Sequence, residues 1–265
     1  MRSEKASQLT FFGVSTLVFA SSLALTISWS ASMSAMGGMQ MPGGWTMSMA
    51  WMRMPGQSWT NVAGSFVGMW IVMMVGMMGP SLVPVLCRFR EAGRGRNGWH
   101  TGRLTALVAL GYFLVWAALG TAAFSAGAAV TTIEMQQPMA ARFVPAAIGL
   151  VVMLAGLLQF TAWKSRHLAC CRALPCRVGL LPLDARHAWG HGVRLGIHCT
   201  CSCAGFTAIL LVLGMMDLWT MGVVTAGITM ERFAPSADRA ARVIGLVGIS
   251  AGVLLTANGL RVVGL

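Results

Sequence analysis

Charged residues are scarce in this sequence. Only 10% of its 265 residues are Asp, Glu, Lys or Arg, whereas 56% are hydrophobic. An ordinary soluble domain carries about 25% charged residues. The shortage of charge therefore excludes a soluble globular protein and indicates a chain embedded in a lipid bilayer.

Nucleotide-binding and common catalytic signatures are also missing. The chain has no Gly-rich phosphate loop, no Walker motif and no recognisable catalytic triad. Without a nucleotide site, any transport has to be passive, linked to protons or coupled to delivery of the cargo. We favour a protein that is not itself an enzyme.

Long apolar runs take the place of the missing charge. Runs of roughly 18 or more apolar residues are typical of transmembrane helices. We therefore predict an all-α, polytopic membrane bundle of about seven transmembrane helices, the sixth of them short enough to need tilting, kinking or partial insertion. The predicted spans are Leu9–Trp29, Gly64–Leu86, Leu104–Val130, Phe143–Trp163, Leu195–Met216, Leu218–Met230 and Val243–Leu260.

Basic residues flank these runs asymmetrically. With seven spans, all but three of the 19 basic residues lie on one side; the exceptions are Arg53, Arg142 and Arg261. Positive residues collect on the cytoplasmic side of membrane proteins. The pattern predicts a cytoplasmic N-terminus and an external C-terminus, and it explains the net charge of +12 without nucleic-acid binding.

The predicted organisation has three parts. Residues 1–30 form a first transmembrane helix with a short cytoplasmic start, which is longer than the apolar core of ~7–15 residues in a signal peptide, so we expect it to stay uncleaved. Residues 31–63 form an external loop rich in Met and Trp, with turns at two Met-Pro-Gly copies. Residues 64–265 form a six-helix membrane domain with a Cys/His-rich cytoplasmic loop over 164–194.

Thiols gather on the predicted cytoplasmic side. Cys199 and Cys203 are i,i+4 neighbours at the start of the fifth span, and His198 and Cys201 are i,i+3 neighbours on an adjoining face. Reduced thiols in this number favour metal binding over structural disulfides; the alternative is that they are small packing residues.

Ligands from the cytoplasmic loop can complete such a site. We expect this loop to supply Cys170, Cys171 and Cys176, and Glu231 to support a ligand or accept a proton. Thiolates select Cu(I), with zinc as the alternative where imidazole contributes.

Methionine is unusually abundant, with 21 residues. Thioethers bind Cu(I), so the external tract is expected to collect the ion; its first members are Met33, Met36, Met39 and Met41. The alternative is an apolar loop lying on the bilayer. In the second span, Met73 and Met77 lie on one helical stripe, which either continues this route inwards or only packs against a neighbouring helix.

Four stretches together resemble a known family. They are WIVMMVGMMGPSLVP (70–84), WKSRHLACCRALP (163–175), GHGVRLGIHCTCSCAGF (190–206) and LGMMDLWTMGVVTAGITMERFAP (213–235). They resemble the predicted metal-binding integral membrane proteins of bacteria, one group of which is a membrane copper chaperone that loads a tyrosinase. The resemblance implies a multi-pass protein of the bacterial inner (cytoplasmic) membrane, with a copper enzyme or the subunits of a membrane complex as its partner. Here the thiols of the fifth span alternate, whereas the family usually has a Gly-Cys-Cys cluster.

Three functions are consistent with these features of the sequence. The first is copper handling, as a chaperone or transporter of Cu(I). The second is a membrane thiol oxidoreductase, although the chain lacks the Cys-x-x-Cys motif on which such enzymes commonly rely. The third is a non-catalytic assembly subunit of a larger copper-dependent membrane complex. We favour the first.

Overall fold

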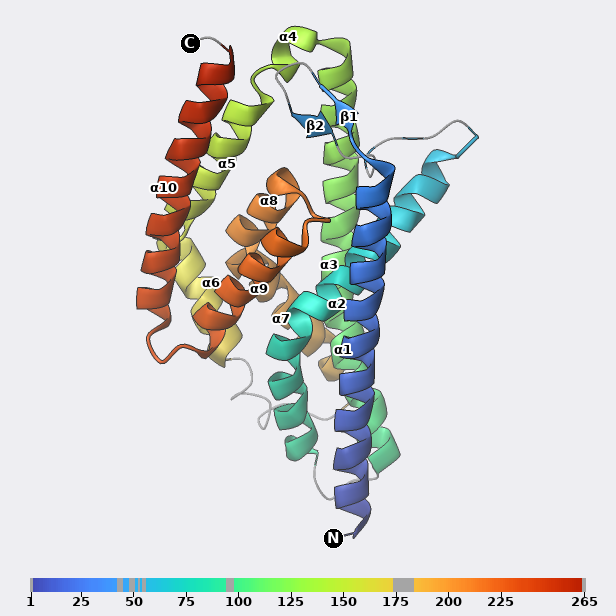
Figure 1. Ribbon diagram of the computed structural model, residues 1–265. Coiled ribbons are helices and arrows are strands. Elements are labelled where there is room, and N and C mark those ends of the chain that lie inside the picture. The colour runs from blue at the N-terminus through green and yellow to red at the C-terminus, as the bar shows by residue number, and fades with distance from the viewer. Residues whose placement is uncertain are drawn as a thin grey trace.

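The computed structural model describes residues 2–41, 45–47, 51, 53, 56–93, 98–173 and 184–263, and the side chains of residues 2–7, 36, 262 and 263 lie outside the description. Within these ranges the chain is helical apart from one two-stranded ribbon and short connections (Figure 1). The elements are α1 Arg2–Met36, β1 Met39–Gln40, β2 Thr46–Met47, α2 Trp59–Ala92, α3 Gly98–Gln136, α4 Pro138–Ala141, α5 Val144–Leu158, α6 Ala162–Ala173, α7 Ala185–Ser202, α8 Ala204–Leu213, α9 Leu218–Phe233 and α10 Ala237–Val263.

The all-α, multi-pass class is confirmed. Four helices (α1, α2, α3 and α10) are long and apolar enough to cross a membrane, and two bent helix pairs raise the number to as many as six. The remaining predicted span corresponds to α9, whose 16 residues extend about 24 Å at 1.5 Å per residue. That is shorter than a hydrocarbon core of about 30 Å. Seven spans and the orientation of the two ends stay predictions.

Two pairs of consecutive helices are sharply bent at a short break. α5 and α6 meet at 64°, and α7 and α8 meet at 62°. The segment predicted as a loop over 164–194 is helical at both of its ends, in α6 and in the first part of α7. Cys176 lies outside the described residues.

The long helices α1, α2 and α3 stand together on one side of the molecule (Figure 1). The indole Nε1 of Trp70 in α2 donates to the carbonyl oxygen of Trp116 in α3 at 3.0 Å, and both side chains are fully buried. Pro80 and Pro84 lie inside α2 and remove two helical hydrogen bonds; Figure 1 shows α2 changing direction near its middle.

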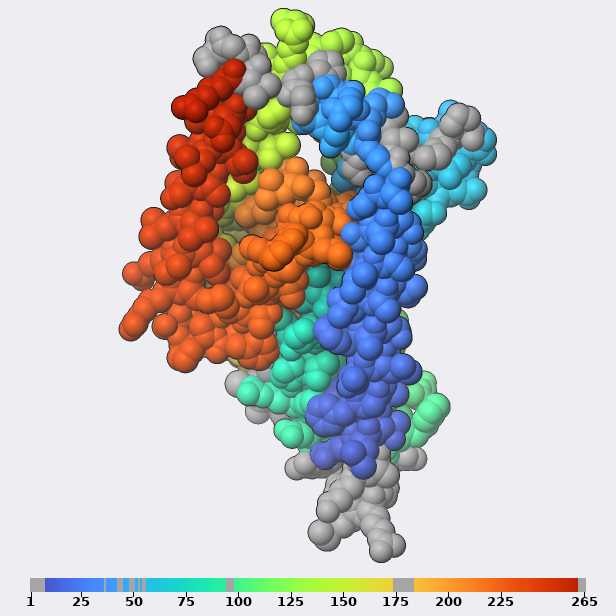
Figure 2. All heavy atoms as spheres, viewed as in Figure 1, coloured from blue at the N-terminus to red at the C-terminus, as the bar shows by residue number. Residues whose placement is uncertain are grey.

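The Met-rich tract between α1 and α2 contains the ribbon. β1 and β2 are antiparallel, with Met39 opposite Met47. The indole Nε1 of Trp45 donates to the Ala141 carbonyl at 2.9 Å, which ties the tract to α4. Figure 2 shows α1 and α10 on opposite flanks of this face, with α8 and α9 between them.

α10 packs along α5 through glycines. A methyl group added to Gly156 would lie 2.7 Å from the backbone nitrogen of Ile249 and 2.9 Å from the carbonyl oxygen of Gly245. Small residues at helix contacts let backbones approach closely, which is how transmembrane helices gain packing energy without a hydrophobic drive in lipid. This contact holds the α5–α6 unit against the C-terminal helix.

We predict that Gly156→Leu lowers the stability of the protein, because the side chain cannot enter without separating α5 from α10. Overpacking of this kind costs about 1–3 kcal/mol or more. The thermal midpoint of the detergent-solubilised protein measures it. Gly222→Leu in α9 is the control, since no atom lies within 4 Å of a methyl group added there. Equal midpoints for the two variants would contradict the role of Gly156.

Candidate functional site

The site is built around the break between α7 and α8. α7 ends at Ser202, and Cys203 adopts φ −96° and ψ 4° at the junction. The hydroxyl of Ser202 donates to the Cys199 carbonyl at 2.9 Å, and the hydroxyl of Thr207 donates to the Cys203 carbonyl at 3.1 Å. These bonds satisfy backbone acceptors where the chain turns by 62°. At the break both Ser202 and Cys203 are buried.

Asp184 caps the start of α7 with a hydrogen bond. The His187 backbone N–H donates to Asp184 at the start of α7 and keeps the pKa of that carboxyl below its usual value.

After α8 the chain reverses at Gly214, whose φ of +119° favours glycine. Asp217 caps α9, and the hydroxyl of Thr220 holds the pKa of Asp217 down. The Met216 carbonyl accepts a hydrogen bond of 2.6 Å from Ser30, which fixes this turn against α1.

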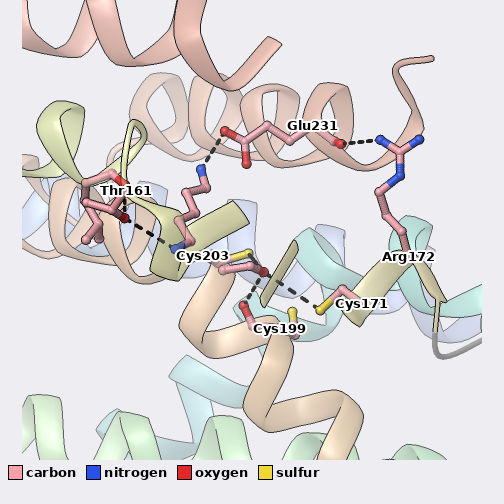
Figure 3. A network of polar contacts seen from close by, with 9 residues as sticks. Thr161, Cys171, Arg172, Cys199, Cys203 and Glu231 are labelled. Carbon is pink, nitrogen blue, oxygen red and sulfur yellow. Dashed lines mark hydrogen bonds and ion pairs between the residues drawn. The ribbon is translucent and has the colours of Figure 1, made fainter. Parts of the chain in front are cut away.

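Three thiols lie together in the core at the break. Cys171, Cys199 and Cys203 are 6%, 0% and 3% exposed. The Ser202 hydroxyl lies between two of them, 3.9 Å from the Cys171 sulfur and 3.8 Å from the Cys203 sulfur. Figure 3 shows the three side chains side by side where α6 meets the break. Residues from α6 and from both sides of the break thus form one buried sulfur cluster, which we call the inner thiols.

A cation and a phenol contact the inner thiols from two other helices. Arg232 of α9 donates from Nη2 to the sulfur of Cys199 at 2.6 Å, and the Tyr112 hydroxyl of α3 lies 3.0 Å from the same sulfur. Arg232 is half-buried; arginine keeps its charge in proteins, and a cation shielded from water is costly without a polar or negative partner. The sulfur of Cys199 is the acceptor that the described residues provide for this guanidinium.

An ion pair lies on the other side of the cluster. Lys164 of α6 contacts Glu231 of α9 at 2.7 Å, and each side chain is 3% exposed. The ammonium also lies 4.8 Å from the centre of the Phe206 ring. Arg172 donates to the Glu231 carbonyl at 3.4 Å, as Figure 3 shows. Glu231 therefore joins α9 to α6 beside the inner thiols, and its ion pair is with Lys164, not with the adjacent Arg232.

The remaining predicted Cys and His ligands lie on another face of the same helices. His198 points away from the inner thiols toward His167 of α6, with 3.0 Å between their Nδ1 atoms. Cys201 is half-buried, and Cys170 is exposed. Among the described residues no group of three or more His, Cys, Asp or Glu side chains is placed to hold a metal ion. The structure thus separates the predicted ligands into two sets.

The methionines of the second span share the core of the inner thiols. Met73 and Met77 are buried in one hydrophobic cluster with Cys171, Cys199 and Cys203. In the external tract, Met33 and Met41 are half-buried and Met39 is exposed. The side chain of Met36 lies outside the description. Met215 and Met221, on either side of the α8–α9 turn, belong to the same core.

Four contact residues were not singled out from the sequence: Tyr112, Lys164, His167 and Arg232. Two of them belong to residue types that are rare in this sequence: Tyr112 is the single tyrosine of the chain, and Lys164 is one of two lysines. A lone polar side chain near an apolar span is often functional. Nothing in the local sequence indicates that Arg232 contacts Cys199, since that contact joins residues 33 apart.

Comparison with known proteins gives one match. A family model described as "PpoB2: Copper chaperone" matches residues 67–255, well over half of the chain. The matched range contains α6 to α9 and all the residues of the inner thiols and their contacts. No curated protein and no solved structure matches the chain.

We predict that Lys164→Met destabilises the protein strongly, because it leaves the Glu231 carboxylate buried without its partner. Breaking a buried ion pair from one side costs about 3–5 kcal/mol. Thermal unfolding of the detergent-solubilised variants measures the loss. The double variant Lys164→Met with Glu231→Leu is expected to recover most of it, and a double variant as unstable as the single would contradict the pairing.

Proposed function

The chain belongs to the PpoB2 copper chaperone family, and from this premise we propose that it holds Cu(I) at the inner thiols and hands the ion to a copper enzyme. The observation that carries the proposal is the burial of Cys171, Cys199 and Cys203 together at a broken helix, with Arg232 against Cys199. Thiolates are the ligands that select Cu(I).

The charge of the site favours a monovalent ion. Cu(I) bound by two thiolates carries a net charge of −1, which the guanidinium of Arg232 balances in the core. Zn(II) bound by the same two thiolates is neutral and would leave Arg232 without a counter-charge.

Methionines supply the proposed route to the inner thiols. Met73 and Met77 lie in the same buried cluster as the three cysteines. Thioethers hold Cu(I) weakly and exchange it without releasing a proton. We propose that the external methionines collect the ion and that the buried ones of α2 relay it; the external set is Met33, Met36, Met39 and Met41.

The other predicted ligands are proposed to support the inner thiols. His198, Cys170 and Cys201 lie on the second face of α6 and α7, and Cys176 is expected to join them from outside the described residues. Glu231 fixes α9 to α6 through Lys164 and thereby keeps Arg232 at Cys199. Its role is to position the site.

The proposed setting is the bacterial inner (cytoplasmic) membrane, crossed several times. The N-terminus and the inner thiols face the cytoplasmic side, and the methionine tract faces outwards, as the distribution of basic residues indicates. The client is a copper enzyme, either free or as a subunit of a membrane complex, in keeping with the chaperone family.

The experiment is to measure copper in anaerobically purified protein. We expect the triple variant Cys171→Ser, Cys199→Ser, Cys203→Ser to contain about one copper ion per chain fewer than the wild type, because its soft ligands are gone. Inductively coupled plasma mass spectrometry gives the stoichiometry. The matched control is Cys87→Ser, since Cys87 is half-buried at the far end of α2 and outside the sulfur cluster.

Elution from a sizing column checks that the triple variant folds. An unchanged copper content in a folded triple variant would overturn the thiol site. If Cys87→Ser lost as much copper as the triple variant, the copper content would depend on the number of thiols and not on the cluster.

A further inference from the structure

A large groove lies among the three long helices α1, α2 and α3, away from the inner thiols. α1 and α3 each pack along α2, and a cavity of about 980 Å³ is lined by residues of all three helices. Ligand sites usually have volumes of about 300–1,000 Å³, so this cavity is at the upper end of that range. Leu82 and Leu86 of α2 line it and are themselves buried.

The groove is apolar along most of its length and open on one side. Its aromatic lining includes Phe12 and Phe19 of α1 and Phe113 of α3. Pro84 of α2 and Ala106 of α3 also line the groove and are exposed on the surface of the molecule. All three helices are long and apolar enough to cross a membrane. The open side therefore faces lipid, and the lining suits a hydrocarbon chain.

One end of the groove is basic. Arg90 of α2 and Arg103 of α3 line the same cavity, and no acidic residue is among the described residues that line it. The guanidinium of Arg90 lies 4.8 Å from the centre of the Phe11 ring of α1, and Arg103 is exposed. This is the end at which α1 begins, α2 ends and α3 begins (Figure 1).

The basic end lies at the level of the membrane surface. Trp99 belongs to the same lining and is 77% exposed, and exposed tryptophans of membrane proteins collect at the boundary between lipid and water. Arg103 and Phe113 are ten positions apart on α3, or about 15 Å at 1.5 Å per residue. Half of a hydrocarbon core of about 30 Å is also about 15 Å, so the groove runs from the lipid headgroups to the middle of the bilayer.

We propose that this groove binds one anionic phospholipid of the leaflet on the predicted cytoplasmic side. An acyl chain lies along the apolar part, and the phosphate lies at Arg90 and Arg103. Basic pockets between transmembrane helices on that side of a membrane bind anionic headgroups in this way. A neutral lipid fits the apolar part equally well but gains nothing from the two guanidinium groups. This site goes beyond copper handling and does not depend on it.

The bound lipid has a structural consequence for α1. Only 11% of the most apolar stretch of this helix is buried inside the molecule. A chain that fills the groove contacts α1, α2 and α3 together and thereby adds to the contacts that hold α1 in place. Because a ligand of the folded state stabilises that state, the lipid is expected to raise the thermal midpoint of the protein.

The test uses the full-length protein, stripped of lipid in a neutral detergent. Titration with phosphatidylglycerol and with phosphatidylcholine of the same acyl chains, followed by native mass spectrometry, is expected to find one phosphatidylglycerol bound per chain in preference to phosphatidylcholine. Each arginine at an anionic lipid contributes a factor of about five. Arg103→Gln, which changes an exposed side chain, should weaken phosphatidylglycerol binding by about fivefold, and Arg90→Gln with Arg103→Gln by about 25-fold.

The matched control is Arg166→Gln with Arg239→Gln. These arginines of α6 and α10 are exposed and outside the groove lining, so the double variant removes the same charge and should change binding by less than about twofold. A loss in this control as large as that in the groove variant would overturn the proposal, because the preference would then reflect total charge.

Ala106→Trp tests the apolar part of the groove. Ala106 is an exposed position of the lining, and an indole there occupies the space assigned to the acyl chain. Loss of the bound phosphatidylglycerol, and of the rise in thermal midpoint that it produces, is the expected result. Unchanged binding in this variant, or equal binding of the two lipids by the wild type, overturns the proposal. The copper content of the same samples reports separately on the inner thiols.

Discussion

The contact between the Arg232 guanidinium and the sulfur of Cys199 is the interaction on which the rest of the site depends. A cation shielded from water needs a negative or strongly polar partner, and for the half-buried Arg232 that partner is a cysteine in the first half of a broken span. The contact joins α9 to α7, the Tyr112 hydroxyl joins α3 to the same sulfur, and the Lys164–Glu231 pair joins α9 to α6. Four helices are thereby held around the inner thiols by polar contacts.

The same arrangement gives copper handling a physical basis. The core around Cys199 is held together by the guanidinium of Arg232 and the hydroxyl groups of Tyr112 and Ser202, so contacts within the protein keep the helices in place. In the proposed site, an ion would replace the hydrogen-bond partners of the sulfurs with coordinate bonds, and Arg232 would be its counter-charge. Cys203 stays one helical turn from Cys199 at the break, because its N–H still donates to the Cys199 carbonyl at 2.9 Å.

Long apolar runs were enough to predict an all-α, multi-pass protein, because burial in lipid requires long uncharged runs. The facing of Cys199 and Cys203 followed from helix geometry alone. The helical ends of the 164–194 segment could not be predicted from hydropathy, because Lys164, Arg166 and Arg172 lower the hydropathy of α6. The partners of the site could not be predicted, since Arg232 and Tyr112 meet Cys199 only through the packing of α9 and α3. His198 was expected to join the cysteines as a ligand, and its contact with His167 of α6 at 3.0 Å could not be predicted, since it joins residues 31 positions apart.

The central claim is that the first Cu(I) ion binds to the sulfurs gathered at the helix break. Extended X-ray absorption fine structure at the copper edge, recorded anaerobically on wild-type protein loaded with one equivalent of Cu(I), tests it most directly. A first shell of sulfur alone, which is lost when Cys199 and Cys203 are replaced by serine, is the predicted result. A first shell of nitrogen or oxygen that persists in that variant would contradict the claim.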